Sequence, residues 1–272
     1  MPSPPEAYGS PCRLCGGRNL RLCYTQGNHG EFRYYRCADC KLVNYDLAGG
    51  LDQEKYAEEF TDPLVPGLAK NRAQTATYRF LRRHLAPPGR LLEIGCGNGR
   101  LLHLAKQDGW TVSGLELSPF MAESVTRRLG IPVRLANIAE PGLAERLGPG
   151  SFDVIALRHV LEHLPDPNAV MALFRTLLTA RGHVVLEFPN IAGLTLRGQR
   201  ALQRTGLHRK KYPPNYHPGH CNEYCRESFQ HLVDRAGFEL LAWETYSRAP
   251  LRNWLVNRLA LGIKARTLIR KR

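Results

Sequence analysis

Four cysteines near the start of the chain have the spacing of a metal site. Cys12 and Cys15 form one C-x-x-C pair, and Cys37 and Cys40 form a second pair after 21 intervening residues. Each pair can place two thiolates on one ion, and four thiolates complete the tetrahedral shell that Zn²⁺ prefers. Because four protein ligands leave no position for water, we predict a structural zinc ribbon. Free or redox-active cysteines are the alternative, which the expected reducing compartment disfavours.

A glycine-rich turn is the second chemical feature. Residues 91–100 read LLEIGCGNGR, so the glycines follow an apolar run and precede a helical one. Glycine has no Cβ, which lets a ligand approach the backbone closely. Glu116 lies 19 residues beyond Gly97, where a carboxylate can accept the ribose hydroxyls of an adenosine cofactor. Dinucleotide enzymes share this logic, but Arg100 occupies the last glycine position of their Gly-x-Gly-x-x-Gly motif.

Five motifs occur in a known order along the chain. They are LEIGCGNG at 92–99, Glu116, Asn137-Ile138, FDVIALRHVLEHLPDP at 152–167, and HCNEY at 220–224 followed by AGF at 236–238. With these motifs the chain resembles the class I methyltransferases that depend on S-adenosylmethionine (SAM). The resemblance is to the broad group that includes ubiquinone-biosynthesis enzymes and enzymes that modify sugars or natural products. It covers roughly residues 91 to 246.

The resemblance implies SAM as the cofactor and a set of residues around it. The implied cofactor-binding residues are Glu93, Gly95, Cys96, Gly97, Asn98, Glu116, Leu117, Asn137, Ile138, Arg158 and His159. An oxygen or carbon acceptor would need a general base, for which the candidates are His163, His220 and Glu223. His220 is our first choice, because it falls in the segment that covers the acceptor site in the resembled family. A structural histidine is the alternative for His163 and His220.

Alternating strands and helices must position these groups. Strands are expected at 90–94, 111–117, 133–137, 152–157, 183–188 and 238–246, with helices at 99–108, 118–129, 168–179 and 227–236. This alternation predicts a Rossmann-like α/β fold with a doubly wound, mostly parallel sheet. We divide the chain into a zinc ribbon (1–48), a helical linker or cap (49–88), a SAM-binding domain (89–248) and a C-terminal segment (249–272).

The C-terminal segment is expected to form a basic amphipathic helix. Leu251, Leu255, Leu259 and Ile263 are four residues apart, with basic residues between them. Such a helix could pack against the domain or lie on an anionic membrane surface. No clear seventh strand is found to pair with residues 238–246, so the sequence leaves that edge of the sheet open.

The net charge of +14 is concentrated in two segments. Residues 190–217 contain six basic residues and 250–272 contain seven, with no acid in either, which leaves 25 basic and 24 acidic residues elsewhere. This distribution predicts an anionic partner near these segments, although a solvated face is the alternative. A phosphate group on a small or carrier-linked acceptor would satisfy it.

Composition and motifs also limit the function classes. The chain has neither an apolar run long enough for a membrane span nor a leader sequence at its start, so we expect a cytoplasmic protein, with membrane-surface contact only through the C-terminal helix. Methylation of a small or carrier-linked acidic metabolite is the leading hypothesis. An RNA methyltransferase is disfavoured, because Leu157-Arg158-His159 stands in place of an Asn/Asp-Pro-Pro-aromatic motif. A non-catalytic binding protein that keeps the fold is the third hypothesis.

Overall fold

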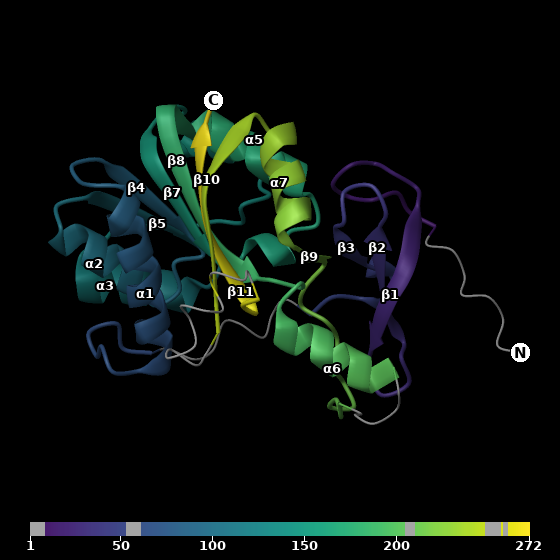
Figure 1. The fold of residues 1–272 in the computed structure, drawn as a ribbon. Coiled ribbons are helices and arrows are strands. Elements are labelled where there is room, and N and C mark those ends of the chain that lie inside the picture. Colours follow the sequence, from purple (N-terminus) through teal and green to yellow (C-terminus); the bar gives the residue numbers. More distant parts are fainter. Residues whose placement is uncertain (1–8, 53–60, 205–209, 248–256, 258–260) are drawn as a thin grey trace, which may run out of the picture.

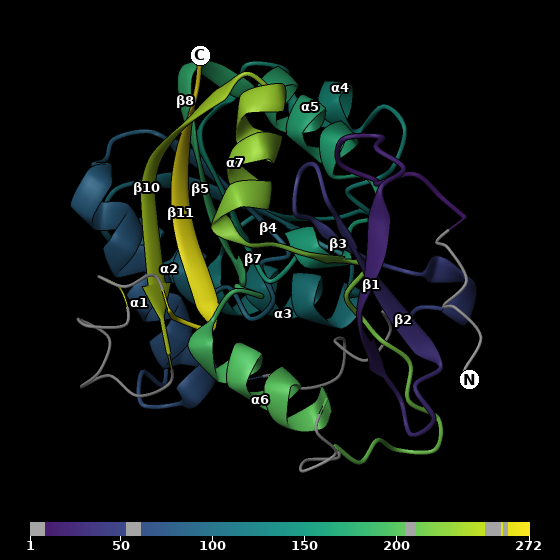
Figure 2. The same cartoon turned by 45° about the vertical axis from the view of Figure 1, so that its right-hand side comes forward.

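Two β-sheets and the helices around them form the protein. The computed structural model describes residues 9–52, 61–204, 210–247, 257 and 261–272. In Figures 1 and 2 the small sheet lies on the side of the large sheet that α5 (Pro167–Leu177) and α7 (Arg226–Arg235) cover, whereas α1 (Ala69–His84) and α2 (Arg100–Gln107) lie on the opposite side. Within the described residues, no helix is both long and apolar enough to cross a membrane.

The large sheet confirms the predicted doubly wound α/β fold. Its seven strands lie in the order β6-β5-β4-β7-β8-β11-β10. The first five are joined by parallel pairs, and β11 runs antiparallel to both of its neighbours. The strands are β4 (Arg90–Ile94), β5 (Thr111–Glu116), β6 (Val133–Leu135), β7 (Phe152–Arg158), β8 (Leu178–Pro189), β10 (Phe238–Tyr246) and β11 (Lys264–Lys271).

Apolar side chains cover both faces of this sheet. Successive residues of a strand point to opposite faces, so a run of apolar residues can serve two helical layers at once. Leu91 shares one buried cluster with Phe80 of α1, whereas its neighbour Leu92 shares another with Phe174 of α5. The near-continuous apolar runs of β4, β7 and β8 are therefore required by helices on both faces.

Local sequence signals explain where two helices begin. In α3 (Pro119–Leu129) the Ser118 side chain accepts a hydrogen bond from the Met121 N–H, and in α5 the Asp166 carboxylate accepts from the N–H groups of Asn168 and Ala169. Both helices have a proline in the first turn, where its missing N–H costs nothing. The remaining α-helices of the described chain are α4 (Leu143–Leu147) and α6 (Leu194–Arg204).

The C-terminal prediction was wrong for residues 264–271, which form β11 and not a helix. This strand is the seventh strand that the sequence analysis did not find, and it lies between β8 and β10. Leu268 faces one buried cluster and Ile269 the other, so both faces of β11 are covered. Arg266 can be buried in this strand because it forms an ion pair with Glu187, which compensates the positive charge that favours an exposed position. The predicted helical residues 251–256 and 258–260, with the membrane contact assigned to them, lie outside the described residues.

The small sheet joins the N-terminal module to a distant part of the chain. It has the order β1-β2-β3-β9, with β1 (Leu20–Gln26), β2 (Phe32–Cys37), β3 (Val43–Tyr45) and β9 (Asn222–Glu223). Val43 pairs with Glu223 and Asn44 with Asn222 in an antiparallel register. The described residues also include two single-turn 3-10 helices, η1 (Leu47–Gly49) after β3 and η3 (Leu161–His163) after β7. The pairing with β9 therefore extends the module beyond residues 1–48, while the domain boundaries themselves stay a prediction.

Candidate functional site

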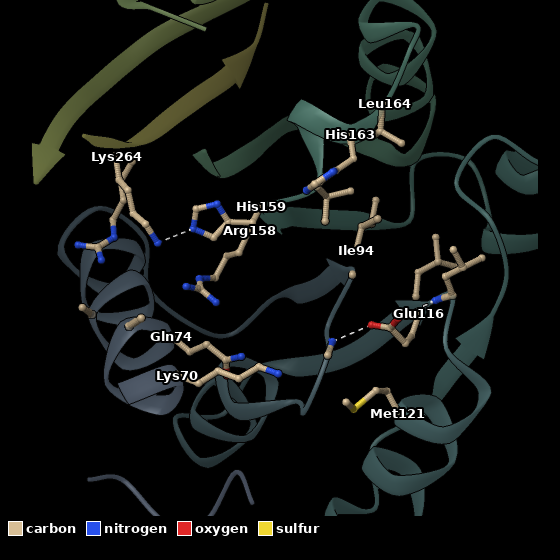
Figure 3. Close-up of a pocket in the computed structure, with 18 of the residues that line it drawn as sticks. Lys70, Gln74, Ile94, Glu116, Met121, Arg158, His159, His163, Leu164 and Lys264 are labelled. Atoms are coloured by element: carbon tan, nitrogen blue, oxygen red, sulfur yellow. Dashed lines mark hydrogen bonds between the residues drawn. The ribbon is translucent and has the colours of Figure 1, made fainter. Parts of the chain in front are cut away.

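A cavity of about 1040 Å³ opens at the carboxyl ends of the parallel strands. β4 pairs with β5 on one side and with β7 on the other, so the strand order reverses there. Open α/β sheets bind ligands at this kind of switch point. In Figure 3 Glu116 and Met121 lie at one side of the cavity, and Lys264 and His159 at the other. We name these sides the donor half (lining residues of 94–138) and the acceptor half (lining residues of α1, 158–164 and 246–266).

Backbone conformation explains the glycines of the donor half. Gly95 has φ +70° and Gly97 has φ +53°, values that residues with a Cβ rarely adopt. A Cβ on Gly95 would lie 2.5 Å from the Val160 side chain, whereas a Cβ on Gly97 would meet no atom within 4 Å. Gly95 is thus required by packing, and Gly97 leaves open space beside the cavity that it lines.

Glu116 is held in place by backbone N–H groups. One carboxylate oxygen accepts from Gly97 at 2.8 Å, and the other accepts from Leu117 at 2.8 Å and Ser118 at 3.0 Å (Figure 3). A carboxylate has about four acceptor positions, so one remains after these three bonds. The oriented carboxylate and the open space at Gly97 fit the ribose and the chain of an adenosine cofactor such as SAM.

Most of the predicted cofactor residues line the cavity. They are Gly95, Gly97, Glu116, Leu117, Asn137, Ile138, Arg158 and His159. Glu93, Cys96 and Asn98 are instead buried beneath the glycine turn. The Asn98 side-chain amide donates to Asn71 Oδ1 at 2.8 Å and to the Thr61 carbonyl at 2.6 Å. These three residues lie beneath the turn on the side away from the cavity and support its backbone. Direct contact with a cofactor stays a prediction for all of these residues.

Glu93 is a buried carboxyl group with an altered proton affinity. Its side chain is almost completely buried, and within the described residues its Oε2 atom has no hydrogen-bond partner. Burial raises the pKa of Glu93 to about 8, against the lowering influence of the Arg158 guanidinium, and Glu116 adds to the rise. At neutral pH the group is therefore mostly protonated.

A buried ionic cluster lies behind the acceptor half. Glu187 of β8 contacts Arg158 at 3.1 Å and Arg266 at 3.0 Å, and it also accepts a hydrogen bond from Thr77 of α1. Burial alone would raise the pKa of Glu187, but Arg158, His159 and Arg266 lower it well below its usual value. The carboxylate therefore stays ionised and joins α1, β7, β8 and β11 at one point.

His159 lies between this cluster and the cavity. Its Nδ1 is 3.0 Å from Glu162, and its Nε2 is 3.2 Å from Glu187 and 2.8 Å from the Lys264 nitrogen (Figure 3). Burial lowers the pKa of His159, but the hydrogen bonds to both glutamates outweigh burial and raise it. The residue has φ +53°, a strained conformation that surrounding structure must maintain. This network fixes the orientation of the ring.

Two predicted candidate bases lie together at the edge of the acceptor half. The ring centroids of His163 and His220 are 4.8 Å apart, and His163 Nδ1 lies 2.7 Å from the Gly219 carbonyl oxygen. His163 lines the cavity, whereas His220 packs beside it and is absent from the lining. Burial lowers the pKa of His163, so its ring is neutral at pH 7. Together with Glu162 the two histidines also offer three ligand atoms within 4.8 Å of one another, a set that could hold a metal ion.

Comparison with known proteins identifies the family. Residues 68–242 match the family described as a methyltransferase domain, which is more than half of the chain. The chain belongs to this family. Its α/β domain is a SAM-dependent methyltransferase domain.

Individual relatives of the methyltransferase differ in how much they share. The ubiquinone biosynthesis O-methyltransferase of Ralstonia nicotianae is 38% identical over 98 residues, which cover 35% of this chain and 41% of the relative. The protein of the same name from Xanthomonas campestris is 28% identical over 198 residues, covering 68% of this chain and 80% of that protein. The chain thus spans less than half of the length of the first relative.

The fold is also shared with solved structures. A SAM-dependent methyltransferase of Thermotoga maritima, described as a possible histamine N-methyltransferase, has a TM-score of 0.52 at 20% identity. The match covers 73% of this methyltransferase and 89% of the other chain. At this identity the likeness establishes the fold alone.

The four cysteines of the N-terminal module lie together as predicted. Their sulfur atoms are all within 4.8 Å of one another, with Cys12 3.5 Å from Cys40 and Cys15 3.6 Å from Cys37. Zn–S bonds of about 2.3 Å in a tetrahedron require sulfur atoms about 3.8 Å apart, so the cluster needs little adjustment to hold the ion. The neighbouring Cys40 thiol lowers the pKa of Cys12, which favours a thiolate at this position. The residues fit a structural zinc site.

Glu223 does not join the other two candidate bases. It lies in β9, where it accepts a hydrogen bond from the Tyr24 hydroxyl at 2.5 Å and contacts Arg200 at 3.5 Å. These contacts connect the small sheet to α6, and Glu223 is not part of the cavity lining. The sequence placed it near His220, but the strand register directs it to the N-terminal module.

Sequence reasoning missed several residues of the acceptor half. Lys70 and Gln74 project into the cavity from α1, which had been assigned to a linker or cap (Figure 3). Lys264 and Arg266 enter from β11, which had been predicted as helix. The one usable signal was Glu187, an acid within the apolar run of residues 184–188, since an unpaired charge does not persist in a buried strand.

Proposed function

We propose that this methyltransferase transfers a methyl group from SAM to a small or carrier-linked acceptor that carries negative charge. The observation that supports the proposal is the asymmetry of the cavity. One half presents the glycine turn and the oriented Glu116 carboxylate, and the other presents basic side chains.

The donor half would hold the cofactor through short-range contacts. Glu116 would accept a ribose hydroxyl, Gly95 and Gly97 would let the methionine part approach the backbone, and Asn137 and Ile138 would flank the adenine ring. When bound, SAM supplies a methyl group that its sulfonium activates. The protein contributes by positioning the two reactants, since an acceptor atom that is already held in line with the methyl group has a lower entropic barrier to reaction.

The acceptor half favours an anion. Among the described residues that line the cavity, five are basic (Lys70, Arg72, Arg158, Lys264 and Arg266), and Glu116 is the single acidic one. Arg158 and Arg266 are partly neutralised by Glu187 behind them, and Lys70 and Lys264 add two further basic side chains to the lining. Carboxylate or phosphate groups on the acceptor would be attracted to this half of the cavity.

His163 is the residue that we propose as general base. Its Nδ1 proton is held by the Gly219 carbonyl, so in the neutral ring Nε2 is the basic atom. The lowered pKa keeps the ring neutral near pH 7, as proton abstraction requires. His220, our first choice from sequence, would support His163 through the ring contact, since it does not line the cavity.

RNA as the acceptor receives less support from the fold. Residues 264–271 of one basic segment (250–272) form β11, where Arg266 pairs with Glu187 and Arg270 with Glu239, and Arg272 pairs with Asp234. Each of these arginines is therefore paired with an acid of the protein, which weakens the attraction that they offer to a run of phosphates. A small acidic acceptor remains the function that the cavity supports best.

Calorimetry and labelling test the proposal. Wild-type protein should bind SAM and its demethylated product, whereas Glu116→Gln should weaken binding by about 10- to 100-fold because a charge-assisted hydrogen bond is lost. Glu145→Gln, an exposed acid of α4, is the matched control. Labelled SAM should then methylate a component of an acidic small-molecule or lipid-linked pool. Absence of SAM binding, or labelling of RNA alone, would contradict the proposal.

A further inference from the structure

The first cysteine knuckle of the zinc module, Cys12 to Cys15, is hydrogen-bonded to residues 219–222, which pack beside His163 at the edge of the acceptor half. We call residues 219–222 the acceptor wall. Arg13 stands between the ligands Cys12 and Cys15. Its Nε donates to Asn222 Oδ1 at 3.0 Å, its Nη1 donates to the Tyr45 carbonyl at 3.0 Å, and its Nη2 donates to the Cys221 carbonyl. A single planar guanidinium thus forms hydrogen bonds both to β3 and to the segment that contains His220.

The same segment is bonded to the residues around His163. The Cys221 N–H donates to the Glu162 carbonyl at 2.9 Å, and the Asn222 side chain donates to the Leu164 carbonyl at 2.7 Å. Glu162 and Leu164 are the two chain neighbours of His163. Gly219, two residues before Cys221, provides the carbonyl that orients the His163 ring. Arg13 is therefore separated from His163 by two layers of hydrogen bonds.

A second connection runs directly from the knuckle to α5. The Asn168 side-chain amide donates to the carbonyls of Arg13 at 3.0 Å and Leu14 at 3.1 Å. Asn168 lies in the first turn of α5, five residues after His163. The knuckle is thus hydrogen-bonded to the acceptor wall through the Arg13 side chain and to α5 through its backbone carbonyls. Cys221 and Asn222 of the acceptor wall are completely buried.

The chemistry of arginine makes this arrangement specific. A guanidinium offers five N–H donors in a rigid fork, whereas a lysine ammonium is a point charge on a flexible stem. If the side chain is truncated, the buried carbonyls of Cys221 and Tyr45 and the Asn222 amide each lose a donor, which is costly in a dry interface. Zinc held by Cys12 and Cys15 would fix the backbone on both sides of Arg13.

We propose that Arg13 is a positioning residue of the methyltransferase and that the zinc knuckle serves to hold the acceptor wall in register. Arg13 sets the place of residues 219–222, which set the orientation of His163. The donor half relies on its own hydrogen bonds between Gly97 and Glu116 and is expected to be indifferent to Arg13. The inference rests on the proposed function only in giving His163 a role at the acceptor.

Side-chain NMR of the full-length, zinc-loaded protein tests this arrangement without a known acceptor. The ring C–H resonance of His163, identified by its loss in His163→Gln, is compared in wild type, Arg13→Ala, Arg13→Lys and Arg21→Ala. Arg21 is exposed on β1 of the same module and is the control. Zinc content is measured by mass spectrometry, and SAM affinity by calorimetry.

Arg13→Ala should shift the His163 resonance, Arg13→Lys should shift it less, and Arg21→Ala should leave it unchanged. All three should keep one zinc ion and bind SAM within about twofold of wild type, because distant sites act independently. An unshifted His163 resonance in folded Arg13→Ala, or the loss of its zinc, would overturn the inference. If Arg13→Ala does not fold, Asn168→Ala decides the question by the same readout. Failure of wild type to bind SAM would refute the proposed function but leave the His163 comparison valid.

Discussion

The two halves of the cavity are built in different ways. The donor half comes from one continuous stretch, residues 94–138, in which three successive strands deliver their carboxyl ends to one place. The acceptor half gathers α1, the turn after β7, and β11, which are separated by up to about 200 residues of chain. Groups that are local in sequence make a site that can be recognised by motif, whereas groups from distant elements depend on how the whole sheet is ordered.

The largest expected effect on the donor half comes from a large side chain in the glycine turn. Gly97→Arg should abolish SAM binding, because the side chain would enter the open space beside Glu116 and the residue would also be strained at φ +53°. Calorimetry should detect no binding, with the affinity at least about 1000-fold weaker. Gly198→Arg in α6, where a Cβ also meets nothing within 4 Å, should bind normally. Retained binding by Gly97→Arg would show that the cofactor does not use this turn.

Removal of one zinc ligand should disturb the N-terminal module and leave the donor half intact. Cys37→Ser should release zinc and destabilise the N-terminal module, because three thiolates hold the ion far less tightly than four. Zinc content and thermal unfolding are the measurements, with Cys23→Ser outside the cluster as control. SAM binding should persist. An unchanged zinc content would disprove the ribbon assignment, and loss of SAM binding would show that the halves are not independent.

Loss of the charge on Glu187 should destabilise the acceptor half. Glu187→Gln leaves Arg158 and Arg266 buried without their carboxylate, which should lower the free energy of unfolding by about 3 to 5 kcal/mol. Glu239→Gln breaks an exposed pair with Arg270 and should cost less than about 1 kcal/mol. Denaturant titration compares the two. Equal effects would mean that the buried cluster does not organise this half.

The proposed base should impose a pH dependence on turnover. The pKa of His163 lies below its ordinary value of 6.5. The rate should therefore be level at pH 7 and above, and it should fall only at pH values below 6.5, where the ring becomes protonated. His163→Gln should lower kcat by about 100-fold with SAM affinity unchanged, and His231→Gln, on α7, is the control. A rate that keeps the same acidic fall in His163→Gln would assign the base elsewhere.

Glu93, buried beneath the glycine turn, should give the stability of the fold a pH dependence of its own. Its pKa of about 8 lies above the usual value, so the folded state holds a proton that the unfolded state releases between pH 4.5 and 8. This group therefore stabilises the fold less as pH rises, by about 3 kcal/mol from pH 5 to 7.5. Glu93→Gln should remove that decline, measured as the difference from wild type across pH. A difference that does not change with pH would place the pKa of Glu93 near its ordinary value.

Prediction from sequence succeeded where a short-range signal exists. Strand and helix alternation and the paired cysteines could both be read from neighbouring residues. It failed at β11, since four-residue apolar spacing and basic charge resemble an amphipathic helix when the partner of Arg266 is unknown. It also misplaced Glu223, whose position depends on pairing with β3.

The sequence by itself determined the chemistry available to this protein: a glycine turn, an acid at residue 116, and four thiolates at the spacing of zinc. These signals are local because the groups act within one strand-turn-helix unit or one metal shell. Only the tertiary structure decided that a C-terminal strand lies between β8 and β10, which brings Lys264 to His159, and that Arg13 holds the segment beside His163. The physical reason is that buried charges and hydrogen bonds find their partners through packing of distant segments, and no spacing along the chain records that choice.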